Sequence, residues 1–140
     1  RLSQVDEARL FGNLHRLMSY HVDVLVGTPG QMQSVIVDTG SAMTAFPCTA
    51  CGTNCGQHID PYFEPQNSSS FRWVGCSEPR CTACSSTSSQ NYCEYRVSYL
   101  EGSSIRGRYF EDVLRLGHVE PSNSQAPVWL GCHVEDTNLF

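Results

Sequence analysis

Residues 34–47 read SVIVDTGSAMTAFP. The apolar, β-branched run before Asp38 is typical of a buried strand, and we expect that strand to be buried on both faces. Thr39 and Ser41 follow with hydroxyl groups, and Gly40 between them lets the backbone approach closely. A carboxylate in such a place must be hydrogen-bonded, and its pKa is open to strong tuning. The simpler alternative is that Asp38 only caps a turn.

The flanking residues predict strands. Apolar and polar residues alternate over 20–26, and Gly27-Thr28-Pro29-Gly30 is a strong turn signal before a second β-rich run at 31–37. Together these segments predict a hairpin. A second one is predicted within 93–116, where a turn separates an alternating run from a long strand at 104–116 with a bend or bulge at Gly107.

A last apolar strand is expected at 127–130, after a polar loop at 117–125. No good amphipathic helix stands out after residues 1–18, which we interpret as a pro-segment remnant, a short leader or a short helix. The chain begins with Arg1, which we interpret as a sign of a processed or recombinant piece. The fold class is therefore mainly β, built from hairpins.

The chain has eight cysteines, and the even number predicts disulfides formed in an oxidising compartment. They are Cys48, Cys51, Cys55, Cys76, Cys81, Cys84, Cys93 and Cys132. Seven lie within 48–93, a stretch without regular periodicity that we interpret as an irregular, disulfide-pinned insert. Their pairing stays open, because eight cysteines allow 105 connectivities.

Zinc is the rival interpretation of the cysteines. Cys48, Cys51, Cys55 and His58 could supply four ligands, and Cys81 with Cys84 two more. The first four lie too close together for the usual spacing of a structural zinc site, so we expect no metal and treat His58 as a loop histidine. Asn67-Ser68-Ser69 is a sequon that makes Asn67 a candidate glycosylation site.

Composition limits the possible partners. The 140 residues fit one domain and carry a formal net charge of −5, with nine basic against 14 acidic residues. Without a basic stripe, we expect no nucleic-acid or anionic-membrane partner. No apolar run in this chain is long enough to span a membrane.

Three segments in order resemble the pepsin-like aspartic proteases. VIVDTGSAMTAFP resembles the active-site loop of that family, YHVDVLVGTPGQMQSVIVDTG the hairpin before it, and CEYRVSYLEGSSIRG its flap. The cysteine-rich segment TACGTNC, followed by PYFEPQNSSSFRWVGCSEPRC, is similar to the insert of nepenthesin-like enzymes. The pattern AFPC…CGQHIDPYF looks most like their plasmepsin V branch.

The resemblance implies that residues 19–140 form part of an N-terminal catalytic lobe. Asp38 would be one of two catalytic aspartates that share a proton and hold a water molecule. Thr39 would brace the loop, Gly40 would turn its carbonyl to the substrate, and Ser41 would orient Asp38. The flap residues that would cover a peptide substrate are Tyr99, Leu100, Glu101, Gly102 and Ser103. No cofactor is implied.

Two departures from the family pattern matter. Ala45 replaces the usual tryptophan that partners the flap tyrosine, and no second Asp-Thr/Ser-Gly is present. The other acids that we considered lack such neighbours: Asp6, Asp23, Asp60, Asp112 and Asp136. The partner carboxylate is therefore expected from a complementary C-terminal lobe or a second chain.

These features predict an aspartic endopeptidase that acts on peptides or proteins, of which this chain supplies half of the active site. The alternative is a catalytically inert, single-lobe binding or decoy protein derived from such a protease. Either is expected in the secretory pathway, outside the cell or in the endoplasmic reticulum lumen.

Overall fold

The computed structural model describes residues 8–13, 19–85, 91–100, 102–116 and 127–137. The first half of the chain contains β1 (Leu10–Asn13), β2 (Ser19–Val26), β3 (Gln31–Ile36), β4 (Ala45–Pro47) and the short 3-10 helices η1 (Thr49–Cys51) and η2 (Pro65–Asn67). The second half contains β5 (Arg72–Trp73), β6 (Glu94–Ser98), β7 (Ser104–Leu116) and β8 (Pro127–Thr137). The fold is mainly β, as the sequence predicts.

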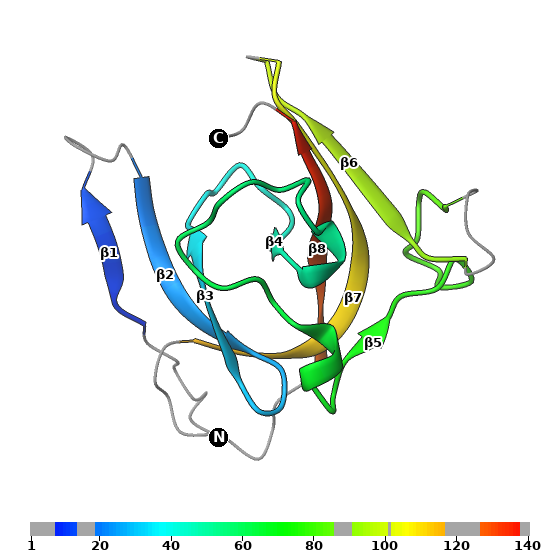
Figure 1. Cartoon of the computed structure of the whole chain (residues 1–140), viewed down its shortest axis with the longest axis horizontal. Helices are drawn as coiled ribbons and strands as arrows, with labels where there is room; N and C mark the ends of the chain where they lie inside the picture. The colour runs from blue at the N-terminus through cyan, green and yellow to red at the C-terminus, as the bar shows by residue number, and fades with distance from the viewer. Residues whose placement is uncertain (1–7, 14–18, 86–90, 101, 117–126, 138–140) are drawn as a thin grey trace, which may run out of the picture.

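The long strand β7 organises the sheet. It pairs antiparallel with β2, β5, β6 and β8, while β4 joins β8 in parallel, which makes the sheet mixed. In Figure 1 β7 curves around the molecule from its hairpin with β6 to its contact with β2. This one strand therefore connects the two predicted hairpins.

Both predicted hairpins are confirmed. β2 pairs with β3 from His21–Ile36 to Val26–Gln31, around the predicted turn, and β6 pairs with β7 from Glu94–Arg108 to Ser98–Ser104. The bend expected at Gly107 is a shift in register against β8 between Arg106 and Gly107. A Cβ atom on Gly107 would collide with the ring of Tyr95 and the carbonyl of Cys132, so only glycine fits there.

Two expectations about element bounds differ from the structure. Leu10–Asn13 form a strand paired with β2, and so these residues do not belong to the short helix that was one alternative for 1–18. β8 continues to Thr137, seven residues beyond the apolar run, because cross-strand pairing with β7 sustains it. The loop predicted at 117–125 lies outside the described residues.

The core is aromatic and joins the insert to the sheet. Phe46, Phe63 and Phe110 are almost completely buried, and the rings of Phe63 and Phe110 stack with centroids 5.3 Å apart. Phe71 stacks on Phe110 at 5.1 Å and meets Trp73 edge to face. Because Phe63 and Phe71 belong to the insert, burial of these rings holds the insert against β7.

All eight cysteines form disulfides, as predicted, so none of them remains as a free thiolate. The pairs are Cys48–Cys132, Cys51–Cys55, Cys76–Cys84 and Cys81–Cys93. Cys48–Cys132 joins the start of the insert to β8, while the other three lie within the insert. The irregular segment is thus pinned internally and to the sheet.

Candidate active site

Asp38 lies just after β3 and accepts two hydrogen bonds from its own turn. The backbone N–H of Gly40 donates to Oδ1 at 2.8 Å, and the hydroxyl of Ser41 donates to Oδ2 at 2.6 Å. Val37, one residue earlier, still donates its N–H to Tyr20 on β2 at 2.8 Å. The sheet therefore fixes the backbone up to Asp38, and the turn orients the carboxylate.

The surroundings of Asp38 are open, and the expectation of a strand buried on both faces is wrong. Ile36 is 68% exposed and Val37 47% exposed, and Asp38 itself is exposed. The physical reason is that β3 pairs only with β2 among the described strands, so one of its edges and part of its surface stay uncovered. Burial therefore adds only a minor cost to charging Asp38 in this chain.

Hydrogen bonding instead governs the acidity of Asp38. The Ser41 hydroxyl, followed by the Gly40 N–H, lowers the pKa of the Asp38 carboxyl below its ordinary value, against a smaller opposing effect of desolvation. Both donors favour the charged form of Asp38, so at mildly acidic pH the carboxylate can accept hydrogen bonds and protons. Ser41 thus has the orienting position that the resemblance implies.

Gly40 and Thr39 complete the turn. A Cβ atom on Gly40 would lie 3.2 Å from Oδ1 of Asp38, which is tighter than ordinary contact, so a side chain at this position would crowd the carboxylate. Thr39 is exposed. Its hydroxyl is therefore accessible from outside this chain.

The turn between β6 and β7 carries the other predicted site residues. Tyr99 donates its N–H to the carbonyl of Ser103 at 2.9 Å, and Gly102 donates to the carbonyl of Tyr99 at 3.0 Å with a positive φ of 95°. Tyr99 and Leu100 are exposed, whereas Ser103 is buried. Glu101 lies outside the described residues. The hairpin therefore presents Tyr99 and Leu100 at an exposed tip.

Ala45 begins β4, which runs beside β8. It pairs with Gly131, and a Cβ atom on Gly131 would lie 2.7 Å from that of Ala45. The strand is therefore packed closely around the small side chain that replaces the tryptophan of the family pattern.

Two acids set aside in the sequence are deeply buried. Asp112 on β7 is fully buried and accepts hydrogen bonds at Oδ1 from the hydroxyl of Ser70 at 2.6 Å and the N–H of Val113 at 2.8 Å. Asp136 on β8 lies near His58 and His133. The sequence does not predict these contacts. The residues involved either lie far apart along the chain or sit in strands without a recognisable motif.

The candidate glycosylation site is accessible. Asn67 ends η2 and is exposed, and its amide donates to a carboxylate oxygen of Glu64 at 2.5 Å. Ser69, the hydroxyl residue of the sequon, is exposed as well. The geometry is compatible with modification of Asn67 in an oxidising compartment.

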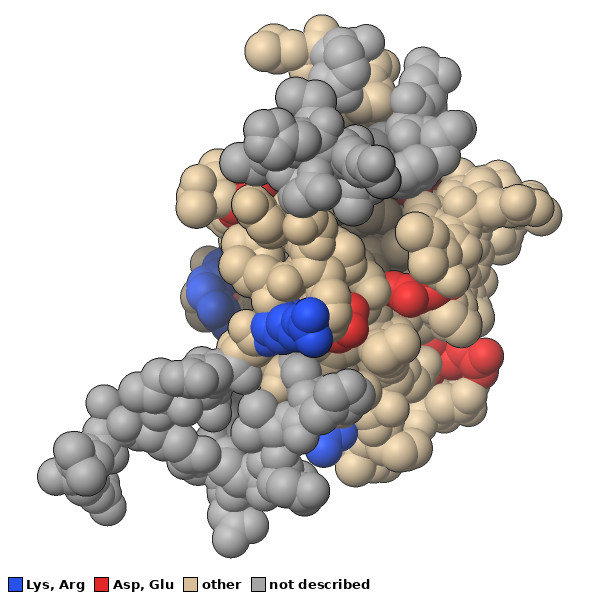
Figure 2. All heavy atoms as spheres, turned by 90° about the vertical axis from the view of Figure 1, so that its left-hand side faces the viewer, with Lys and Arg blue, Asp and Glu red and all other residues tan. Residues whose placement is uncertain are grey.

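Charge is sparse on the face that carries β1, β2 and β3. Figure 2 shows it mostly uncharged, with a few basic and acidic side chains and no continuous basic stripe among the residues described there. Across the described part of the chain, no helix has the length and apolar character needed to cross a membrane. The four disulfides are typical of proteins of the secretory pathway.

Known proteins match nearly the whole chain. The family described as "Xylanase inhibitor N-terminal" matches residues 20–140. The chain is 44% identical over 98% of its length to aspartic protease 5 of Toxoplasma gondii, and covers 16% of that protein. It is 32% identical over 99% of its length to plasmepsin V of Plasmodium falciparum, covering 23%. It is also 39% identical over 81% of its length to nepenthesin-1 of Nepenthes gracilis, covering 25%.

The chain thus spans a quarter or less of the length of these relatives. The matched region, the mainly β fold with its two hairpins, and the Asp-Thr-Gly-Ser turn all agree with one assignment. The chain belongs to the pepsin-like aspartic protease family and corresponds to its N-terminal lobe.

Proposed function

We propose that this chain is the N-terminal part of an aspartic endopeptidase and that Asp38 is one of its two catalytic carboxylates. The observation that carries the proposal is the exposed carboxylate of Asp38, held by the Gly40 N–H and the Ser41 hydroxyl. Each carboxylate oxygen accepts one bond from the turn and keeps lone-pair capacity for a water molecule or a shared proton.

Such a carboxylate suits a two-aspartate mechanism. A water molecule held between Asp38 and a second carboxylate attacks the peptide carbonyl, one carboxylate accepts the water proton, and the other protonates the carbonyl oxygen. Two carboxylates at close range share one proton, because both cannot ionise cheaply. The hydrogen bonds from Ser41 and Gly40 favour the ionised state at Asp38, which fits the role of general base.

A complementary lobe would supply the second carboxylate. Ile36 at the end of β3 and Val37 after it are large apolar side chains left exposed directly before Asp38. Exposed apolar surface of this kind marks a site of association. A C-terminal lobe, or a second chain, that covered these side chains would also face Asp38, where Thr39 is exposed to brace against it.

The β6–β7 hairpin would act as the flap. Its exposed Tyr99 and Leu100, with Glu101, Gly102 and Ser103, would close over a bound peptide and exclude water from the reacting carbonyl. Residues 1–18 would include the remnant of a pro-segment or leader, and Asn67 would carry a glycan. Together with the four disulfides, these features support a location in the secretory pathway, in the endoplasmic reticulum lumen or outside the cell.

The second candidate is an inert, single-lobe binding or decoy protein. The same exposed apolar residues favour it, since a lobe without its counterpart has surface free for a partner. Both functions share the fold and differ in whether Asp38 takes part in cleavage.

Peptide cleavage at about pH 5 tests the proposal, with and without a pepstatin-type inhibitor. The protease containing this chain and its complementary lobe should cleave, and Asp38→Asn should lower kcat by more than about a thousandfold. Asp23→Asn is the matched control, because Asp23 accepts a hydroxyl hydrogen bond from Ser34 at 3.0 Å on the neighbouring strand. Full activity of Asp38→Asn would refute the proposal, and inactivity of the assembled wild type would favour the binding function.

A further inference from the structure

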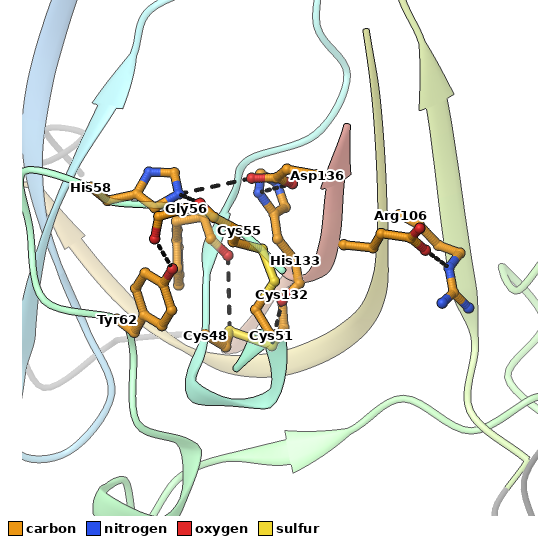
Figure 3. The surroundings of a disulfide bond; sticks show 12 residues. Cys48, Cys51, Cys55, Gly56, His58, Tyr62, Arg106, Cys132, His133 and Asp136 are labelled. Atoms are coloured by element: carbon orange, nitrogen blue, oxygen red, sulfur yellow. Dashed lines mark hydrogen bonds and ion pairs between the residues drawn. A yellow bond between two sulfur atoms is a disulfide. The ribbon is translucent and has the colours of Figure 1, made fainter. Parts of the chain in front are cut away.

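The end of β8 contains a nearly buried carboxylate between two imidazoles. The side chain of Asp136 is only 6% exposed. Its Oδ1 lies 3.3 Å from Nδ1 of His133, and its Oδ2 lies 3.8 Å from Nε2 of His58. Figure 3 shows Asp136 directed toward both rings, one from β8 and the other from the insert. None of this cluster belongs to the site around Asp38.

No permanent cation among the described residues pairs with Asp136. All nine basic residues of the chain are arginines. Those with ion pairs in the described part are Arg72 with Glu78 and Glu111, Arg106 with Glu135, and Arg108 with Glu94. Figure 3 shows Arg106 apart from the cluster. Positive charge beside Asp136 in the described part therefore comes from a protonated His58 or His133.

The other described contacts of the two imidazoles are with neutral groups, and Nε2 of His58 also lies 2.5 Å from the carbonyl oxygen of Cys55. Tyr95 on β6 packs its ring against His133 at 6.2 Å, and its buried hydroxyl has no hydrogen-bond partner within the described structure. Burial, and next the charge of Asp136, raise the pKa of Tyr95. Tyr62 meets the ring of His58 edge to face and donates its hydroxyl to Gly56. A buried carboxylate in such surroundings is costly unless an imidazole is charged.

The cluster lies where the insert meets β8 beside the turn end of the β6–β7 hairpin. The N–H of Asp136 donates to the carbonyl of Asn54 at 3.2 Å, inside the loop closed by Cys51–Cys55. On β8 the same residue pairs with Ile105, the second residue of β7. A change in the cluster thus acts on the insert loop and on the turn end of the hairpin together.

We propose that His58, Asp136 and His133 form a proton-dependent clamp that fastens the insert loop at residues 51–58 to β8, beside the turn end of the β6–β7 hairpin. In acid, a proton on an imidazole gives the buried carboxylate a cation, and the loop is held. In alkali both imidazoles are neutral, the carboxylate has no cation, and the loop is released. Histidine is the side chain whose charge most often changes between about pH 5 and 8, so the test compares the two ends of that range.

Amide hydrogen exchange on the full chain tests the clamp without any measurement of activity, so its result is independent of the proposed protease function. Protection factors, corrected for the intrinsic dependence of exchange on pH, are compared at about pH 5.5 and 8. Wild type should be about tenfold more protected in acid at the Asp136 amide and at residues 51–58. Asp136→Asn should abolish this difference, because the amide needs no cation.

Further variants keep the test decisive. His58→Gln and His133→Gln should each reduce the acid-dependent protection while leaving the β2–β3 hairpin protected. His21→Gln is the control, since His21 stacks on Phe11 at β1 and should leave the difference intact. Protection that does not change with pH in the wild type, or an unchanged pH response in Asp136→Asn, would overturn the proposal. If Asp136→Asn does not fold, a pH-dependent protection that is unchanged in both histidine variants would overturn the proposal.

Discussion

The turn around Asp38 and the cysteine-rich insert are stabilised in opposite ways. Asp38 is held by donors two and three residues away, Gly40 and Ser41, on an exposed surface. The insert is held by three disulfides of its own and by buried links to distant strands, among them the disulfide Cys48–Cys132 and the hydrogen bond from Ser70 to Asp112. The proposed chemistry is therefore local in sequence, whereas stability is distributed.

This difference has a practical consequence. Substitutions in the turn should alter the pKa of Asp38 and the rate of cleavage, with little effect on folding, because no core contact is lost. Substitutions in the insert should unfold the chain, and their effect on cleavage should follow the loss of folded protein. The predictions below test this separation, from the largest expected change to the smallest.

The largest effect is expected from Cys48→Ala with Cys132→Ala. The removed link closes a loop with a sequence separation of 84, for which chain entropy predicts a loss of about 4.5 kcal/mol in the free energy of unfolding. The matched control removes Cys51–Cys55, with a separation of four, where the same relation predicts about 2 kcal/mol. Urea unfolding measures both, and equal losses would contradict the distributed account of the insert.

Ser70→Ala should be next. It removes the hydroxyl that donates to the fully buried Asp112 carboxylate at 2.6 Å, and a hydrogen bond to a charged group contributes about 2 kcal/mol. Ser34→Ala is the matched control, because its hydroxyl also donates to a carboxylate, that of Asp23, but at an exposed position. An equal shift of the urea midpoint in both variants would mean that burial of Asp112 is unimportant.

Gly40→Ala should spare stability and impair function. The added methyl group would lie 3.2 Å from Oδ1 of Asp38, and displacing the carboxylate by a few tenths of an ångström should lower kcat about tenfold in the assembled protease. Gly75→Ala is the control, because the nearest atoms to its Cβ lie at 3.8 Å. Peptide cleavage and urea unfolding on the same samples separate the two effects, and a large loss of stability in Gly40→Ala would contradict the comparison.

The sequence predicts the regular part of the fold well. β7 has the predicted bounds, Ser104–Leu116, and β2 begins one residue before the predicted strand, because alternation over these segments reflects real burial of Val22, Val24 and Val26. β1 and the end of β8 were not predicted as strands, since pairing rather than an apolar pattern defines them. The burial predicted for 35–37 failed because β3 has one partner strand among those described.

At the candidate site, the sequence predicts contacts between residues close together along the chain, but not contacts between residues far apart along it. The donors to Asp38 are within the quoted stretch, so Ser41 could be assigned an orienting position from the pattern alone. The disulfide pairing and the approach of His58 to Asp136 depend on how the insert folds back on β8. No local pattern encodes that path, which explains why His58 was interpreted as an ordinary loop histidine.

The smallest expected change, and the most direct test of the central claim, is the titration of Asp38 itself. The claim is that its own turn keeps this carboxylate ionised. Because the hydrogen bonds lower its pKa, they stabilise the folded state above the ordinary pKa of an aspartate and lose that effect as pH falls through the lowered value.

Carbon-13 NMR of the side-chain carboxyl should show Asp38 titrating below an ordinary aspartate in the wild type. In Ser41→Ala the pKa should rise toward the ordinary value, because the largest of the lowering effects is removed. Ser34→Ala, which removes a hydroxyl from Asp23 instead, should leave Asp38 unchanged. An Asp38 titration that is the same in Ser41→Ala as in the wild type would contradict the account.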